Sequence, residues 1–164
     1  MFRMVTATAL TLFLATFGMS RTAAAQPPAS KTAVGSWVET VTFPAEIGRP
    51  PIKSLVTFHD DGTMTCSDQG AVTTVGEMPS VFTSCHGVWK RLHSSTLAYT
   101  QLELISDLSG NLIGQLKVRG VYTVSASGNE YDGVSFAEII LTDGTVVFSS
   151  EVANAGQRIQ LELP

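Results

Sequence analysis

Two polar residues in one strand-like run are the best candidates for chemistry. Gln101 and Glu103 alternate with other residues in the segment 96–105, whose composition predicts a β-strand. They share parity with Tyr99 and Ile105, so these four side chains point to the same face of the strand. If that face is buried, the pKa of Glu103 rises and its carboxyl becomes a candidate acid or base.

The other face of the same strand offers a competing interpretation. It carries Ala98, Thr100, Leu102 and Leu104. We expect this leucine face to lie inward and Glu103 to lie in water, because burial of an unpaired carboxylate is costly. The same argument places Glu39 and Glu138 outward.

Cys66 and Cys85 are the two cysteines of the chain, and we expect them to form a disulfide. Closure of a loop of about 20 residues stabilises a fold by roughly 3 kcal/mol in the chain-entropy model. The alternative is a nucleophilic Cys85 beside His86. Adjacent strand residues point to opposite faces, so this pair is badly placed for proton transfer.

Neither a metal centre nor a catalytic triad is indicated. His59, His86 and His93 show no spacing typical of metal ligands, and there is no Cys-x-x-Cys pair. The run Ser84-Cys85-His86 lacks the Gly-x-Ser-x-Gly elbow that exposes a nucleophilic serine. We therefore expect no metal and no cofactor.

Short runs of β-forming residues fill the chain after residue 34, separated by turns rich in Gly, Asp and Asn. The expected strands are 35–43, 52–58, 63–67, 71–75, 86–92, 96–105, 112–124, 131–141, 145–152 and 157–163. Most are joined by short turns, with a further turn at 154–156. The pattern predicts an all-β fold, an antiparallel up-and-down meander closed into a barrel of eight to ten strands.

The segment 112–124 indicates which side chains face the barrel interior. Its apolar set is Leu112, Leu116, Val118, Tyr122 and Val124, with Gly114 and Gly120 in the same parity. Lys117 and Arg119 occupy the other face.

A ligand cavity is one outcome of this pattern, since an eight-stranded barrel can hold one small molecule. Small inward residues (Gly114, Gly120, Gly133, Ser135 and Ala137) would leave space inside. The expected walls are Phe58, Trp89, Tyr99, Tyr122 and Phe136. A solid barrel, in which larger neighbours fill the same space, is the alternative.

The first 25 residues have the features of a secretory signal peptide. Arg3 precedes a 13-residue uncharged run, and Ala23-Ala24-Ala25 offers a cleavage site. That run is shorter than the roughly 20 residues of a membrane-spanning helix. We therefore expect a signal peptide over 1–25, a disordered lead-in over 26–34 and one barrel domain over 35–164, in a secreted or periplasmic protein.

The charge of the expected mature chain excludes some partners. Residues 26–164 contain eight basic and 14 acidic residues, a net charge of −6. A domain this acidic has no electrostatic attraction for nucleic acid or for an anionic membrane.

A short motif in the chain resembles one of a known family. Gly35-Ser36-Trp37 opens the first expected strand, and Arg158 lies in the last. This arrangement resembles the lipocalins and other calycins. The resemblance implies a barrel whose end is closed by the Trp37 indole beneath the Arg158 guanidinium. With His86-Gly87-Val88-Trp89, the chain is also similar to uncharacterised secreted bacterial lipocalin-like proteins.

Three functions are compatible with such a barrel. The first is a binding module for a small apolar or amphipathic ligand. The second is an isomerase or cyclase, since allene oxide cyclases use similar barrels; Gln101 and Glu103 would be the catalytic candidates. The third is a protein-binding or inhibitory role through the loop 44–51 or the segment 68–84.

Overall fold

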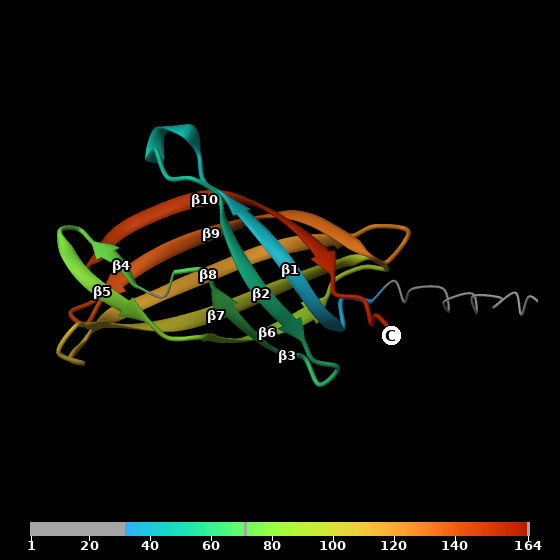
Figure 1. Cartoon of the computed structure of the whole chain (residues 1–164), viewed down its shortest axis with the longest axis horizontal. Helices are drawn as coiled ribbons and strands as arrows, with labels where there is room; N and C mark the ends of the chain where they lie inside the picture. Colours follow the sequence, from blue (N-terminus) through green and yellow to red (C-terminus); the bar gives the residue numbers. More distant parts are fainter. Residues whose placement is uncertain (1–31, 71, 164) are drawn as a thin grey trace, which may run out of the picture.

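The computed structural model describes residues 32–70 and 72–163 as one all-β domain (Figure 1). The proposed signal peptide and most of the lead-in lie outside the described residues. The strands are β1 (Gly35–Thr42), β2 (Ile52–Phe58), β3 (Thr63–Asp68), β4 (Val72–Val75), β5 (Met78–Phe82), β6 (Cys85–Arg91), β7 (Thr96–Asp107), β8 (Leu112–Val124), β9 (Glu130–Leu141) and β10 (Val146–Arg158).

Eight of these strands close into an antiparallel barrel, which confirms the predicted fold class. The sheet order is β4-β5-β7-β6-β3-β2-β1-β10-β9-β8, and pairing of β7 with β8 completes the ring. The β4–β5 hairpin extends the sheet at one end of the barrel, where Phe82 pairs with Ile105 of β7 (Figure 1). Closure leaves none of the eight ring strands as a free edge.

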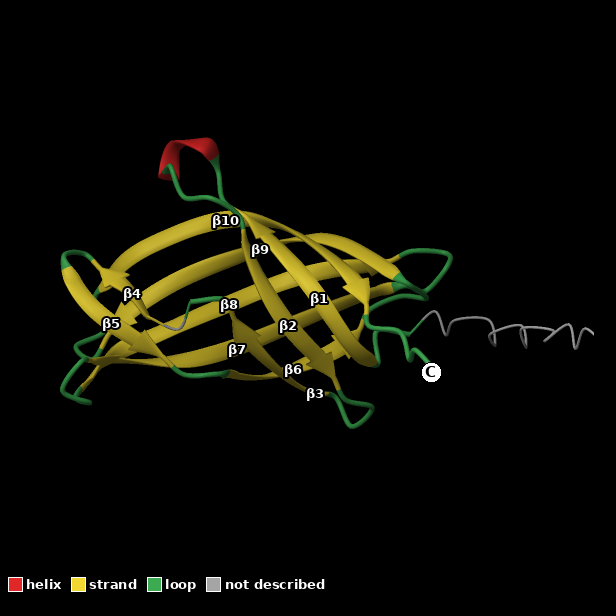
Figure 2. Ribbon diagram, viewed as in Figure 1, coloured by secondary structure: helices red, strands yellow, loops and turns green. Residues whose placement is uncertain are grey.

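Helical structure is minor among the described residues. A single 3-10 turn, Ala45–Ile47, lies in the loop between β1 and β2 and projects from the barrel (Figure 2). No helix within residues 32–70 and 72–163 has the length and apolar character needed to cross a bilayer.

Three local predictions were wrong. The expected turn at 154–156 is part of β10, because Asn154 stays in register with both Val41 of β1 and Gly133 of β9. The last strand was expected at 157–163, but only residues 157 and 158 are in the sheet, as the end of β10, and residues 159–163 lie outside it. Leu112, expected inside, is 54% exposed because it lies where the β7–β8 register shifts.

One half of the barrel is filled by a solid core. Trp37, Phe58 and Tyr122 have at most 2% of their surface exposed. The Tyr122 and Tyr131 rings stack with centroids 4.5 Å apart, and Phe58 meets both of them edge-on. These aromatic contacts add to the free energy of apolar burial.

Glycines on the inner face make room for these rings. A Cβ at Gly120 would lie 2.6 Å from the Tyr99 ring, and one at Gly156 would lie 2.3 Å from the Tyr131 ring. In this half, the space left by small residues is therefore occupied by tyrosines, as in the solid-barrel alternative.

Arg158 closes this end of the barrel. Its guanidinium carbon lies 4.2 Å from the centroid of the Trp37 ring. The guanidinium also donates hydrogen bonds to the carbonyl oxygens of Thr32, Val34 and Gly128, at 2.6–2.7 Å. A Cβ at Gly35 would lie 2.5 Å from Arg158 Nη1, and Gly35 has φ +128°. The Gly-x-Trp motif thus leaves space for the arginine that covers the indole.

We expect Arg158→Lys to lower the free energy of unfolding by about 1–2 kcal/mol. A single ammonium cannot replace a planar guanidinium that donates to three carbonyls and lies over a ring. Urea titration measures the change, with the exposed Arg91→Lys as the matched control. Equal stability of the two variants would contradict the role given to Arg158.

The predicted disulfide joins Cys66 and Cys85, with Cα atoms 4.9 Å apart. The two residues form the last pair of the β3–β6 ladder. Beyond this point β3 and β6 diverge, and the chain between them forms the β4–β5 hairpin. The disulfide therefore fixes the barrel wall where regular pairing of these two strands ends.

Replacement of both cysteines by serine should lower the free energy of unfolding by roughly 3 kcal/mol, because the unfolded chain loses a closed loop of about 20 residues. Urea unfolding measures this loss, and Ser67→Ala, at an exposed neighbouring position, is the control. Unchanged stability, together with two titratable thiols in the denatured wild-type protein, would contradict the disulfide.

Candidate functional site

The half of the barrel away from Trp37 contains a cavity of about 180 Å³. For comparison, an engineered apolar cavity of about 150 Å³ can hold benzene. Its apolar lining consists of Val41, Phe43, Ile52, Phe82, Leu116, Val118, Ala137, Ile139, Phe148 and Val152. Exposed residues such as Arg49, Gly70 and Thr74 also line it, so the cavity opens to solvent at the end that carries the β4–β5 hairpin.

The barrel is thus solid at one end and hollow at the other. The sequence analysis left a solid barrel and a barrel with a ligand cavity as alternatives, and each of them describes one half of the structure. Along β1, the inward residues Trp37, Glu39 and Val41 lead from the closed end to the cavity.

A layer of buried polar side chains separates the two halves. The Tyr131 hydroxyl donates to Glu39 Oε2 at 2.7 Å, and the Tyr99 and Tyr122 hydroxyls are hydrogen-bonded at 2.7 Å. Beside them, Ser135 donates to Asn154 Oδ1. The pairs join β9 to β1, β7 to β8 and β9 to β10, so the layer adds side-chain hydrogen bonds between strands that lie near one another in the sheet.

Glu39 is a buried member of this layer, with 5% of its surface exposed, so its predicted outward position was wrong. Burial raises its pKa, while hydrogen bonds from Tyr122, Tyr131 and Asn154 act in the opposite direction. These partners explain why a carboxyl can occupy the interior here. Glu138 does lie on the outer face, where it pairs with Arg119.

Glu103 also points inward, contrary to our expectation, and is 3% exposed. The leucine face of β7 lies outside instead, with Leu102 41% and Leu104 50% exposed. The inward set includes the large side chains of Tyr99 and Ile105, whose burial favours this orientation of β7.

The Glu103 carboxyl has an unusual environment. Among the described residues, its Oε1 is the buried side-chain oxygen that has no hydrogen-bond partner. Burial and the nearby Asp68 carboxylate raise the pKa of Glu103 to about 8. The carboxyl is therefore mostly protonated at neutral pH and can change its charge near physiological pH.

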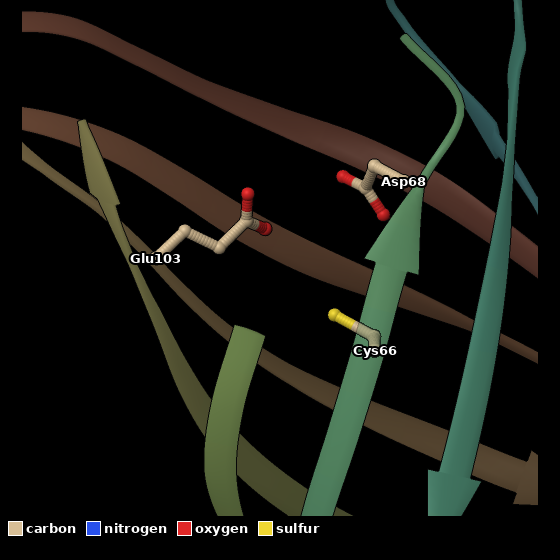
Figure 3. Close-up of side chains that lie close together, drawn as sticks. All are labelled: Cys66, Asp68 and Glu103. Atoms are coloured by element: carbon tan, nitrogen blue, oxygen red, sulfur yellow. The ribbon is translucent and has the colours of Figure 1, made fainter. Parts of the chain in front are cut away.

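Asp68, at the end of β3, and Glu103 of β7 point toward each other (Figure 3), and their two strands lie on either side of β6 in the sheet. The Cys66 sulfur and the nearest carboxylate oxygens of Asp68 and Glu103 all lie within 4.8 Å of one another. Burial also raises the pKa of Asp68, although Ser54 and Arg49 act in the opposite direction. Because the Cys66 sulfur is bonded to Cys85, it is not a thiolate ligand, and two carboxyls remain to act on a bound molecule.

The structure distributes the predicted site residues over three regions. Tyr99, Gln101 and Glu103 line the cavity together. Tyr122 lies just below it, hydrogen-bonded to Tyr99, and Phe58 lies in the solid core.

Like Phe58 and Tyr122, two further aromatic residues that we predicted as cavity walls are absent from the lining. Trp89 packs against the solid core, and its indole donates to the His59 carbonyl oxygen. Phe136 is on the outer face, 39% exposed and beneath Arg119, because it has the opposite parity to the buried Ser135 and Ala137.

The sequence analysis missed Asp68 and the hairpin residues of the site. Asp68 shares the parity of the buried Met64 and Cys66, and this signal could have placed it inside. Thr73, Thr74 and Phe82 also line the cavity. We did not predict strand β5 because it contains Pro79, and proline is uncommon within strands. In the structure β5 pairs with β4 and with the end of β7.

Comparisons with known proteins identify no family. No family model and no curated protein matches the chain. A similar solved structure is that of EF1p2_mFAP2b bound to DFHBI, with 17% sequence identity and a TM-score of 0.45. The alignment covers 80% of this chain and 98% of that chain. Function is therefore argued from the residues of the site.

We expect the free energy of unfolding to fall as the pH rises from about 5 to 8. The pKa of Glu103 is about 8 in the folded state against 4.5 for the ordinary side chain. Between these values the unfolded chain releases a proton that the folded protein retains, so rising pH favours unfolding. Urea titrations across this range measure the slope.

Glu103→Gln should flatten this pH dependence, because the ionisable group is removed. The exposed Glu151→Gln is the matched control and should follow the wild-type curve. A Glu103→Gln curve that is parallel to wild type from pH 5 to 8 would contradict the raised pKa.

Proposed function

We propose that this protein is a secreted, lipocalin-like binding module that holds a small amphipathic molecule in the open half of its barrel. The observation that carries this proposal is the composition of the cavity. Its walls are mainly apolar, and its inner end carries the buried polar residues Tyr99, Gln101 and Glu103. Concave apolar sites with a few fixed polar groups are typical of small-molecule binding.

The closed end supports the lipocalin-like part of the proposal. Trp37 beneath Arg158 has the geometry that the resemblance implies. The disulfide is compatible with an oxidising compartment, and the proposed signal peptide supplies the route of export. Mass spectrometry of the exported chain tests this part, with an N-terminus near Gln26 expected.

Ligand binding is tested by filling the cavity. The wild-type protein should show a thermal shift with members of a panel of amphiphiles and aromatic dyes, and Ala137→Phe should abolish it. Ala137 lines the cavity, whereas the control Ala155→Phe alters the exposed face of β10.

A second variant guards against misfolding of Ala137→Phe. Thr74→Trp places bulk at the exposed rim of the cavity, where the barrel core is untouched, and should weaken binding. No shift with any compound, or equal shifts in wild type and both cavity variants, would contradict the binding function.

A second candidate function is an enzyme of the isomerase or cyclase type. It is favoured by the inward position of Gln101 and by a Glu103 carboxyl whose pKa of about 8 suits proton transfer near neutral pH. Mass spectrometry of bound compounds before and after incubation tests it, with Glu103→Gln as the inactive control. Ligands recovered unchanged from the wild-type protein would exclude turnover of those compounds.

We assign the segment 68–84 to the ligand site in preference to a protein-binding surface. Asp68, Gln69 and Gly70 at its start, and Phe82, Thr83 and Ser84 at its end, all line the cavity.

A further inference from the structure

The cavity has an acidic inner surface that the binding of a purely apolar molecule would not require. Three carboxyl groups line it, from Glu39 of β1, Asp68 of β3 and Glu103 of β7. Arg49 is the one basic residue among the described lining residues, and it lies at the exposed rim above the Phe43 ring.

The three carboxyls differ in their partners. Glu39 accepts hydrogen bonds from Tyr131 and its neighbours within the polar layer. Ser54 contacts the Asp68 carboxylate. Glu103 is 97% buried, and its Oε1 has no hydrogen-bond partner. A buried acceptor without a partner costs about 1–3 kcal/mol, so a ligand that donates a hydrogen bond here gains affinity.

We propose that the ligand is a small amphipathic amine whose ammonium group lies between Asp68 and Glu103. The proposal rests on the binding function above and defines the chemistry of its ligand. The ammonium donates one N–H to Glu103 Oε1 and another to Asp68, and the apolar body lies against Leu116, Phe82 and Phe148.

The spacing of the two carboxyls suits this group. An ammonium nitrogen about 2.8 Å from each oxygen, with tetrahedral N–H directions, spans oxygens about 4.6 Å apart. The nearest oxygens of Asp68 and Glu103 lie within 4.8 Å of each other (Figure 3). The two side chains reach this position from β7 and β3, on either side of β6, and this separation allows one ammonium group to bridge their oxygens.

The charges around Glu103 determine how binding depends on pH. The titratable or charged groups that line the same cavity are Glu39, Arg49, Asp68 and Tyr99. An ammonium group favours the ionised form of Glu103, which is the minor form below pH 8 in the free protein. Apparent affinity is reduced by the fraction of protein that is not binding-competent, so it should increase with pH.

The cavity is electrostatically unfavourable for an anionic ligand. Its head group would have to bind at Arg49, on the rim, or approach three acidic residues inside the cavity. The net charge of the described lining therefore favours a cation over a fatty acid or another carboxylate.

Isothermal titration calorimetry with octylammonium, 1-octanol and octanoate tests the proposal. The three probes share one apolar chain and differ in the head group, and an alkylammonium stays charged throughout the range pH 6–9. We expect octylammonium to bind at least about tenfold more tightly than the other two at pH 8, and its affinity to rise at least about tenfold from pH 6 to 8.

Two variants assign the selectivity to the carboxyl pair. Glu103→Gln should remove both the preference for octylammonium and its pH dependence while octanol binding persists. Asp68→Asn should reduce the preference if Glu103→Gln does not fold. Glu151→Gln on the outer surface is the control and should behave as wild type.

The outcomes separate this inference from the binding function. Equal or tighter binding of octanol or octanoate overturns the amine proposal and leaves the binding function in place. Binding of Ca²⁺ alone that Glu103→Gln abolishes, with no preference for octylammonium, also overturns it. Failure of all three probes to bind, together with no thermal shift across the broader panel, overturns both.

Discussion

The hydrogen-bonded layer across the middle of the barrel is the constraint on which the rest of the structure depends. Three hydrogen-bonded pairs connect neighbouring or next-neighbouring strands: Glu39 with Tyr131, Tyr99 with Tyr122, and Ser135 with Asn154. Buried polar groups are tolerated when their partners are fixed, and fixed partners require a fixed strand register. This layer therefore separates a packed core on one side from a cavity on the other.

Each half of the barrel is stabilised by a specific interaction. At the closed end, Arg158 covers Trp37 and binds carbonyls of the chain that leads into β1. At the open end, the Cys66–Cys85 disulfide joins β3 and β6 at the last residue pair of their ladder. A rigid wall at this point keeps the carboxyls of Asp68 and Glu103 close to each other.

The sequence was sufficient to predict the general architecture. Asp-Gly turns and alternating β-forming runs predicted an antiparallel barrel, and two cysteines in a chain that we expected to be exported predicted the disulfide. The sequence did not determine which face of β7 points into the barrel, because the face with Leu102 and Leu104 is as apolar as the face that is buried. Their outward position follows from packing around Tyr99 and Glu103, which involves strands far apart in the sequence.

The candidate site was only partly predictable, because its residues also come from strands that lie far apart in the sequence. Gln101 and Glu103 were identified by their types and spacing, but their partner Asp68 lies 35 positions earlier and meets Glu103 only once the barrel is closed. Phe136 was assigned to the cavity as an aromatic residue, although its parity with the outward residues of β9 places it outside. Asn154 was assigned to a turn because Asn and Gly at 154 and 156 are typical turn residues. Its buried partner Ser135 lies on another strand and was not evident from the local sequence.

The central claim is that a functional carboxyl lies in the open half of the barrel. It is tested most directly by ¹³C NMR titration of the Glu103 side-chain carboxyl, first in the free protein and then with octylammonium bound. The account predicts a midpoint near pH 8 in the free protein, because of burial and the neighbouring Asp68, and a lower midpoint in the complex. A midpoint near 4.5 in the free protein, unchanged by the amine, would contradict it.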